Sequence, residues 1–88
     1  MAPTAQTIRV RVLFFGRLKD VAGIAEESCE LADGATIESL FADLVKRNAE
    51  LARFRPSLVA SRNEEFAAWN TPLLAHDEIA FLPPVSGG

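Results

Sequence analysis

The chain has only one cysteine, Cys29, and one histidine, His76, among its 88 residues. A single cysteine excludes an internal disulfide framework and fits a reducing compartment, so we expect a cytoplasmic protein. Cys29 lies on the inward side of an expected strand, where it is better explained as a small buried hydrophobe than as a reactive thiol. His76 has no cysteine or second histidine near it, so the sequence predicts no metal site.

Long apolar runs and an excess of basic residues are also missing. No segment is long and apolar enough for a membrane span, and residues 1–7 lack the basic and apolar regions of a signal peptide. We expect residues 1–7 to form a short disordered lead-in. A net charge of −3 and a pI near 5.0 argue against nucleic acid and favour a partner with a basic surface.

The chain also lacks recognisable catalytic patterns. It has no phosphate-binding loop, no nucleophile triad and no zinc-ligand spacing. The acidic pairs Glu26-Glu27 and Glu64-Glu65 would point to opposite faces of a strand and would not form an acid–base pair. The sequence therefore does not predict an enzyme that acts on its own.

The first apolar segment predicts a strand over residues 8–15. Its even-numbered residues share one apolar face, whereas the other face begins with two arginines and ends with Leu13 and Phe15. An apolar patch on an outer face usually marks a partner surface, although a loop or helix of the same chain is an equally ordinary cover for it.

A long amphipathic helix is predicted after two shorter elements. Residues 17–23 form a helical turn that Gly23 ends, and residues 26–32 form a second strand. Thr36 is a suitable N-cap for the long helix, and Asn48 can end it. The apolar stripe of this helix fits a sheet beneath it and consists of Ile37, Leu40, Phe41, Leu44 and Val45.

Short strands complete the expected fold. The remaining chain predicts an irregular link over 51–56, strands over 57–61, 66–69 and 78–82, and a turn over 62–65. In the last strand, Ile79 and Phe81 should face inward, and Ala80 and Leu82 outward. Two strands followed at once by a helix indicate an α+β fold. One main helix packed on a mixed sheet is the β-grasp arrangement of ubiquitin-like domains, which would occupy residues 8–83.

The sequence closes with an extended tail over residues 84–88. The segment from Pro83 onward reads Pro83, Pro84, Val85, Ser86, Gly87 and Gly88. Proline stiffens the chain and glycine gives the slimmest backbone, so this segment suits insertion into a narrow active site of another protein. Nothing follows Gly88, so its carboxylate would be the terminal group. A frayed end without a function is the ordinary alternative.

Three motifs resemble the sulfur-carrying small subunit of molybdopterin synthase, a ubiquitin-like protein family. They are residues 12–23, residues 63–66 with 71–73, and residues 77–88. The resemblance covers nearly all of the chain from Ile8 onward. The ending Pro-Pro-Val-Ser-Gly-Gly is its most specific part, because Gly-Gly alone also ends ubiquitin-like modifiers and the thiamin sulfur carrier.

The resemblance implies a chemistry centred on Gly88. In that family an E1-like activating enzyme uses ATP and Mg²⁺ to adenylate the C-terminal carboxylate, and a sulfur donor converts it to a thiocarboxylate. The carrier then gives its sulfur to cyclic pyranopterin monophosphate inside the large subunit, in a heterotetramer of two small and two large subunits. The carrier itself would need no bound cofactor and no metal, because its partners supply the active sites.

The resemblance also assigns a docking role to three apolar residues, of which strand alternation places Phe15 and Leu82 outward. Phe15, Phe66 and Leu82 match docking positions of the family, which favours a partner surface over a covering loop. His76 departs from the family pattern, because glycine is common at that position. If the position requires a positive φ, His76 is strained.

Other functions remain open from the residues alone. A carrier of sulfur for thiamin or another metabolite, and a modifier conjugated to lysines through Gly88, would use the same tail chemistry with a different acceptor. An interaction module with an inert tail would tolerate an added C-terminal residue, whereas the carrier and the modifier would not.

Overall fold

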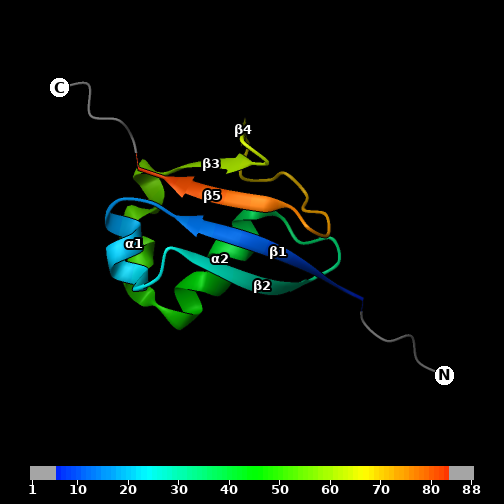
Figure 1. Ribbon diagram of the computed structural model, residues 1–88, viewed down its shortest axis with the longest axis horizontal. Coiled ribbons are helices and arrows are strands. Elements are labelled where there is room, and N and C mark those ends of the chain that lie inside the picture. The colour runs from blue at the N-terminus through cyan, green and yellow to red at the C-terminus, as the bar shows by residue number, and fades with distance from the viewer. Residues whose placement is uncertain (1–5, 84–88) are drawn as a thin grey trace.

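The computed structural model describes residues 6–83, which form one mixed sheet with a long helix across it (Figure 1). The strands are β1 (Thr7–Phe14), β2 (Glu26–Ala32), β3 (Val59–Arg62), β4 (Glu65–Ala67) and β5 (Glu78–Leu82). The helices are α1 (Arg17–Ala22), α2 (Ile37–Arg47) and the 3₁₀ helix η1 (Ala49–Ser57). The expected tail residues Pro84, Val85, Ser86, Gly87 and Gly88 lie outside the described residues.

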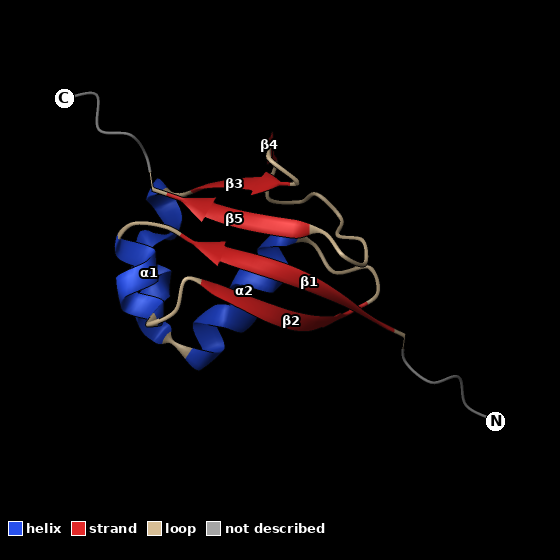
Figure 2. Ribbon diagram, viewed as in Figure 1, coloured by secondary structure: helices blue, strands red, loops and turns tan. Residues whose placement is uncertain are grey.

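The five strands follow the order β2-β1-β5-β3-β4. The central strands β1 and β5 run parallel, and every other neighbouring pair is antiparallel. The long helix α2 crosses behind the sheet in Figure 2, so it covers one face and leaves the other open. This arrangement confirms the expected α+β fold, in which a mixed sheet packs on one main helix as in the β-grasp domain.

The core lies between the sheet and α2. Val12 of β1 and Ile79 and Phe81 of β5 face inward and have no exposed surface. The helix contributes Ile37, Leu40, Phe41 and Leu44, which are all buried and belong to the stripe that the sequence predicts. Burial of such side chains stabilises each by about 1.5–3 kcal/mol relative to exposure, so this layer fixes how α2 sits on the sheet.

Local signals set the ends of α2 as expected. The Thr36 Oγ1 accepts the Ser39 N–H at 3.2 Å, and the Ser39 Oγ accepts the Thr36 N–H at 2.8 Å. This reciprocal capping box satisfies two backbone donors that the first turn leaves free. Asn48 ends the helix in an extended conformation, and its side chain accepts the Glu50 N–H, which starts η1.

Several sequence-based boundaries were wrong. The segment expected as an irregular link over 51–56 is part of η1, because Asn48 caps a new helix whose Leu51 reaches the core. The strand expected over 57–61 is β3, which starts and ends later, and the strand expected over 66–69 is β4, which ends at Ala67. Thr7 pairs with Ala32, so β1 begins inside the segment that we expected to be a disordered lead-in.

Candidate functional site

The open face of the sheet carries an apolar surface near the end of β5. Phe15, Phe66 and Leu82, the three residues expected to dock a partner, all line one depression of about 310 Å³. Leu13 and Ala80 complete its apolar lining. We call these five residues the outer apolar surface. The structure therefore brings together the three side chains that the sequence placed 51 and 16 residues apart (66 − 15 = 51; 82 − 66 = 16).

Sheet register explains why these residues meet. Parallel pairing of Phe14 with Phe81 brings Phe15 beside Leu82 at the same end of the sheet. Antiparallel pairing places Ser61 opposite both Ala80 and Phe66, so the row continues from β5 across β3 to β4. Because side chains alternate between the two faces of a strand, all of these point away from α2.

The outer apolar surface is open in residues 6–83. The exposed fraction is 43% for Phe15 and 80% for Phe66, so no segment within this part of the chain covers either ring. Large exposed apolar side chains that gather in one place mark an interaction surface. A covering loop or helix, the alternative left open by the sequence, is therefore absent among residues 6–83.

The base of the tail lies at the same end of the sheet. Pro83 directly follows Leu82, is half-buried, and has its Cγ 3.4 Å from the place where a Cβ of Gly16 would lie. Gly16 has a φ of 58° and a ψ of −134°, a conformation that favours glycine, and it turns the chain from β1 into α1. The chain thus leaves the sheet beside the outer apolar surface.

Charged residues border this surface toward β2. The Arg11 guanidinium lies 2.9 Å from the Glu26 carboxylate and 3.1 Å from the Glu78 carboxylate. These exposed ion pairs contribute little to stability, since solvent screens them. They form a charged patch over β2, β1 and the start of β5, beside the outer apolar surface.

A hydrogen-bond network that sequence reasoning missed positions the β3–β4 turn. The Asn63 Nδ2 donates to the Asp77 Oδ1 at 2.9 Å, and the Asn63 Oδ1 accepts the Glu78 N–H at 2.9 Å. Asp77 is buried and also accepts the Leu74 N–H at 2.8 Å. This network ties the turn to the start of β5 and so fixes where Glu64 and Phe66 stand. An asparagine in a turn was its only sequence signal.

The residues that the sequence analysis weighed for other chemistry lie apart from this surface. Cys29 is buried on the inner face, as expected, and burial raises the pKa of its thiol. His76 has a φ of 72°, so the strain anticipated at this position is present, and its N–H donates to the Arg9 carbonyl at 2.7 Å. Residues 6–83 contain no group of three or more metal-ligating side chains.

No helix in this described part of the chain is long and apolar enough to cross a membrane.

The fold and the site together define a class of protein. A β-grasp domain with an apolar partner surface, beside the point where its C-terminal segment leaves the sheet, is a ubiquitin-like carrier or modifier domain.

Comparison with known proteins narrows this class. The model of the ThiS family matches residues 12–88, and the chain belongs to this family. It is 34% identical over 83 residues to the molybdopterin synthase sulfur carrier subunit of Chlamydomonas reinhardtii. The alignment covers 92% of this chain and 100% of that protein.

Solved structures of similar proteins have the same fold. SAMP1 from Haloferax volcanii is 30% identical with a TM-score of 0.80, over 91% of this chain and 99% of that one. The protein–protein complex of subunits 1 and 2 of the molybdopterin-converting factor from Helicobacter pylori contains a chain that is 28% identical with a TM-score of 0.60. That match covers 92% of this chain and 100% of the other.

Proposed function

We propose that this chain is the sulfur-carrier small subunit of a molybdopterin synthase and is not catalytic on its own. The observation that carries the proposal is the outer apolar surface at the base of the tail, in a chain similar to curated sulfur carrier subunits. An exposed apolar surface beside a slim C-terminal segment lets a partner hold the domain while its active site receives the tail.

The proposed chemistry takes place at the Gly88 carboxylate. A free carboxylate is a poor electrophile, so an E1-like enzyme with ATP and Mg²⁺ converts it to an acyl-adenylate and releases pyrophosphate. The terminal sulfur of a persulfide donor attacks the acyl carbon and expels AMP. A thiol then cleaves the resulting acyl disulfide and leaves a thiocarboxylate. This chain holds no cofactor in the scheme and contributes reach and a carboxylate.

The proposed partners follow from this scheme. The thiocarboxylate transfers its sulfur to cyclic pyranopterin monophosphate in the large subunit, in an assembly of two small and two large subunits. The complex of subunits 1 and 2 from Helicobacter pylori supports the large subunit as the partner. A cytoplasmic location fits the single, buried cysteine.

A protein modifier is the second candidate. The likeness to SAMP1, named in a solved structure as small archaeal modifier protein 1, favours it. A carrier and a modifier share activation of the C-terminus and differ in the group that accepts the activated acyl carbon. This group is a persulfide sulfur for the carrier and a lysine amine for the modifier.

Intact mass spectrometry tests the proposal. The protein is incubated with the activating enzyme of its organism, ATP and a sulfur donor, beside a variant that lacks Gly88. We expect a mass gain equal to the exchange of one oxygen for one sulfur, absent from the variant. An unchanged mass, with an activating enzyme shown to be active, would reject the carrier. A series of heavier conjugates would favour the modifier.

A further inference from the structure

A second apolar depression lies on the far side of Phe66 from the outer apolar surface. It has a volume of about 430 Å³, and its lining includes Leu58, Val59, Phe66, Ala67, Ala68 and Trp69. No charged residue lines it, whereas Glu64 and Glu78 line the depression on the other side of Phe66. We call this depression the Trp69 groove.

The Trp69 ring forms the floor of the groove and is packed on several sides. The Trp69 ring stacks on Phe81 at a centroid distance of 5.5 Å and meets the edge of Phe41 at 5.5 Å. The Arg55 guanidinium lies 3.5 Å from the Trp69 ring centroid, and the Glu38 carboxylate holds it at 2.7 Å. Because Trp69 is fixed on several sides, the groove exists before any partner arrives, which lowers the entropic penalty of binding.

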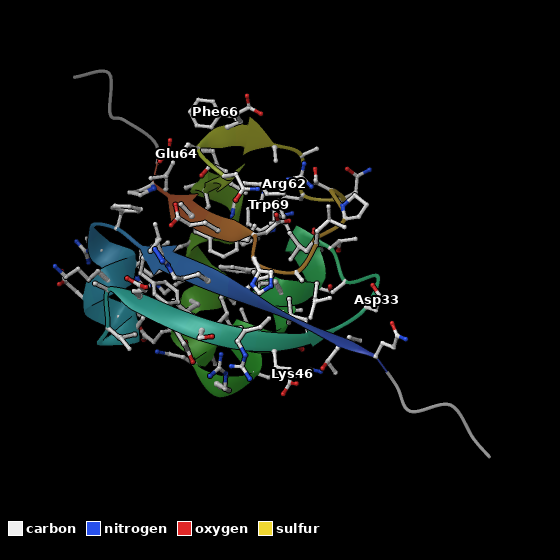
Figure 3. The ribbon with its side chains drawn as sticks, turned by 45° about the vertical axis from the view of Figure 1, so that its right-hand side comes forward. Asp33, Lys46, Arg62, Glu64, Phe66 and Trp69 are labelled. Atoms are coloured by element: carbon white, nitrogen blue, oxygen red, sulfur yellow. The ribbon has the colours of Figure 1, made fainter. Side chains whose placement is uncertain are left out.

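The groove and the outer apolar surface form one continuous apolar region. Phe66 lines both depressions and projects at the β4 end of the sheet, away from Trp69 (Figure 3). Val59 is 43% exposed and pairs with Leu82 across β3 and β5, so it extends the apolar contact between them. A partner that covers Leu82 and Phe66 therefore reaches the groove without crossing a charged residue.

Uncompensated acidic charge stands at the end of this region. Glu64 and Glu65 occupy the turn and the first residue of β4, both are exposed, and neither forms an ion pair with another residue of 6–83. Glu64 lines the depression of the outer apolar surface and Glu65 directly precedes Phe66, and carboxylates that flank an apolar contact favour a partner with a cation at the matching place.

We infer that the large subunit of molybdopterin synthase contacts this chain beyond Phe66. It places an apolar side chain in the Trp69 groove and a flanking basic residue opposite Glu65. This inference rests on the proposed function, and it adds to the docking residues Phe15, Phe66 and Leu82 a second contact region. The large subunit is the occupant because a solved relative is held in complex with it.

A charge placed in the groove tests the inference. Ala68 is exposed and lines the groove, so Ala68→Glu adds a carboxylate there, and Ala42→Glu adds the same group on the exposed side of α2 as a matched control. In calorimetry with the purified large subunit we expect Ala68→Glu to raise the Kd at least about tenfold and Ala42→Glu to leave it unchanged. If Ala68→Glu lowers the melting temperature, Ala68→Gln tests the same place without a charge.

Charge reversal tests the flanking cation. We expect Glu65→Lys to raise the Kd by about threefold to tenfold, and Asp33→Lys, an equal change in net charge on an exposed turn elsewhere, to have a smaller effect. Equal effects of the two variants would show that only net charge matters and would overturn the assignment to Glu65.

The outcomes separate this inference from the proposed function. Unchanged affinity of Ala68→Glu together with weakened binding of Leu82→Asp would overturn the inference and leave the carrier role intact. Unchanged affinity of both variants would reject docking through the open face altogether. Weaker binding of Ala68→Glu to the activating enzyme alone would show that the occupant is assigned to the wrong partner.

Discussion

His76 holds a left-handed backbone conformation that glycine adopts more easily. Its φ is 72°, whereas Ala75 beside it has no positive φ. We expect His76→Gly to raise the free energy of unfolding by about 0.5–1 kcal/mol, because relief of strain exceeds the added flexibility of the unfolded chain. Ala75→Gly should lower it by a similar amount, and urea denaturation measures both. A loss of stability in His76→Gly would show that the side chain contributes contacts that outweigh the strain.

Cys29 gives stability a dependence on alkaline pH. Burial, aided by the Glu27 carboxylate, raises the pKa of its thiol above the usual value of 9.0, although the Arg47 guanidinium acts in the opposite direction. The folded state therefore keeps the proton to higher pH than the unfolded state. The thiol's contribution to stability is complete below the unfolded pKa and is lost as pH rises through the folded pKa.

The expected outcome is a fall in the free energy of unfolding from about pH 9 upward, steeper in the native protein than in Cys29→Ala. Urea titrations at several pH values measure it. Identical pH profiles for the two proteins would mean that the thiol titrates alike in both states. A thiol reagent should also react slowly with the folded protein and rapidly in urea.

Phe15 and Leu82 should carry much of the affinity for the large subunit. Leu82→Asp places a charge within an apolar contact, and Phe15→Ala removes a ring that is 43% exposed in residues 6–83. We expect each to raise the Kd by about tenfold to a hundredfold in calorimetry while the domain stays folded. Leu74→Asp is the matched control, since Leu74 is exposed but lies outside the outer apolar surface.

For single residues, the sequence predicts which face of a strand a side chain occupies, because side chains alternate between the two faces. Phe15 and Leu82 were placed outward by their parity alone, and Phe66 was added by the family resemblance. The bond from Asn63 to Asp77 spans 14 residues, and its geometry depends on how β5 packs beside the turn. Glu64 and the lining of the Trp69 groove follow from the same packing, so local patterns gave no signal for them.

Among the elements, α2 depends on its N-terminal capping box. Replacing Thr36 by alanine removes the Oγ1 that accepts the Ser39 N–H. We expect Thr36→Ala to lower the free energy of unfolding by about 1 kcal/mol and Thr36→Ser to change it little, because serine caps equally well. Urea denaturation followed by circular dichroism measures this. Equal stability of all three proteins would mean that water replaces the cap without loss.

The bounds of a helix or strand are predicted well where one hydrophobic repeat continues over several turns. The stripe of α2 repeats over three turns, and its bounds were found to within a residue. β3 and β4 are four and three residues long, too short for alternation to fix their ends. The turn between them uses positive φ at Asn63 and Glu64, and Glu64 has no sequence preference for that conformation. Trp69 was expected in a strand but lies beyond β4, where it packs against Phe41 and Phe81.

For the whole molecule, composition and element order predicted the fold class but not the strand order. In the parallel pairing of β1 with β5, Arg11 pairs with Glu78, a residue 67 positions later in the chain (78 − 11 = 67), so no local sequence pattern specifies this contact. This pairing brings Phe15 beside Leu82, so the outer apolar surface and Pro83, where the chain leaves the sheet, are neighbours. The parallel pairing of β1 with β5 therefore builds the core on one face of the sheet and the outer apolar surface on the other.

Because the outer apolar surface and the start of the C-terminal segment are neighbours, we expect two separable roles. The folded domain would bind the partner, and the C-terminal segment would carry the reacting group. The described sheet, helices and both apolar depressions are built from residues 6–83, so we expect a protein ending at Pro83 to fold and keep both depressions. We expect it to inhibit thiocarboxylate formation on the full-length chain competitively, with an inhibition constant near the Kd of the full-length chain for the activating enzyme. A synthetic peptide of residues 83–88 should be neither a good substrate nor a good inhibitor.

The measurement is the rate of mass gain at several concentrations of the competitor, and the Leu82→Asp version of the shortened protein is its control. Competition by the shortened protein that Leu82→Asp abolishes would place the binding energy in the folded surface. Strong inhibition by the peptide alone would place it in the tail, and the outer apolar surface would then have no part in recognition by the activating enzyme. We expect the first result, because binding energy held by the folded domain would bring the C-terminal segment to the reacting centre of the partner.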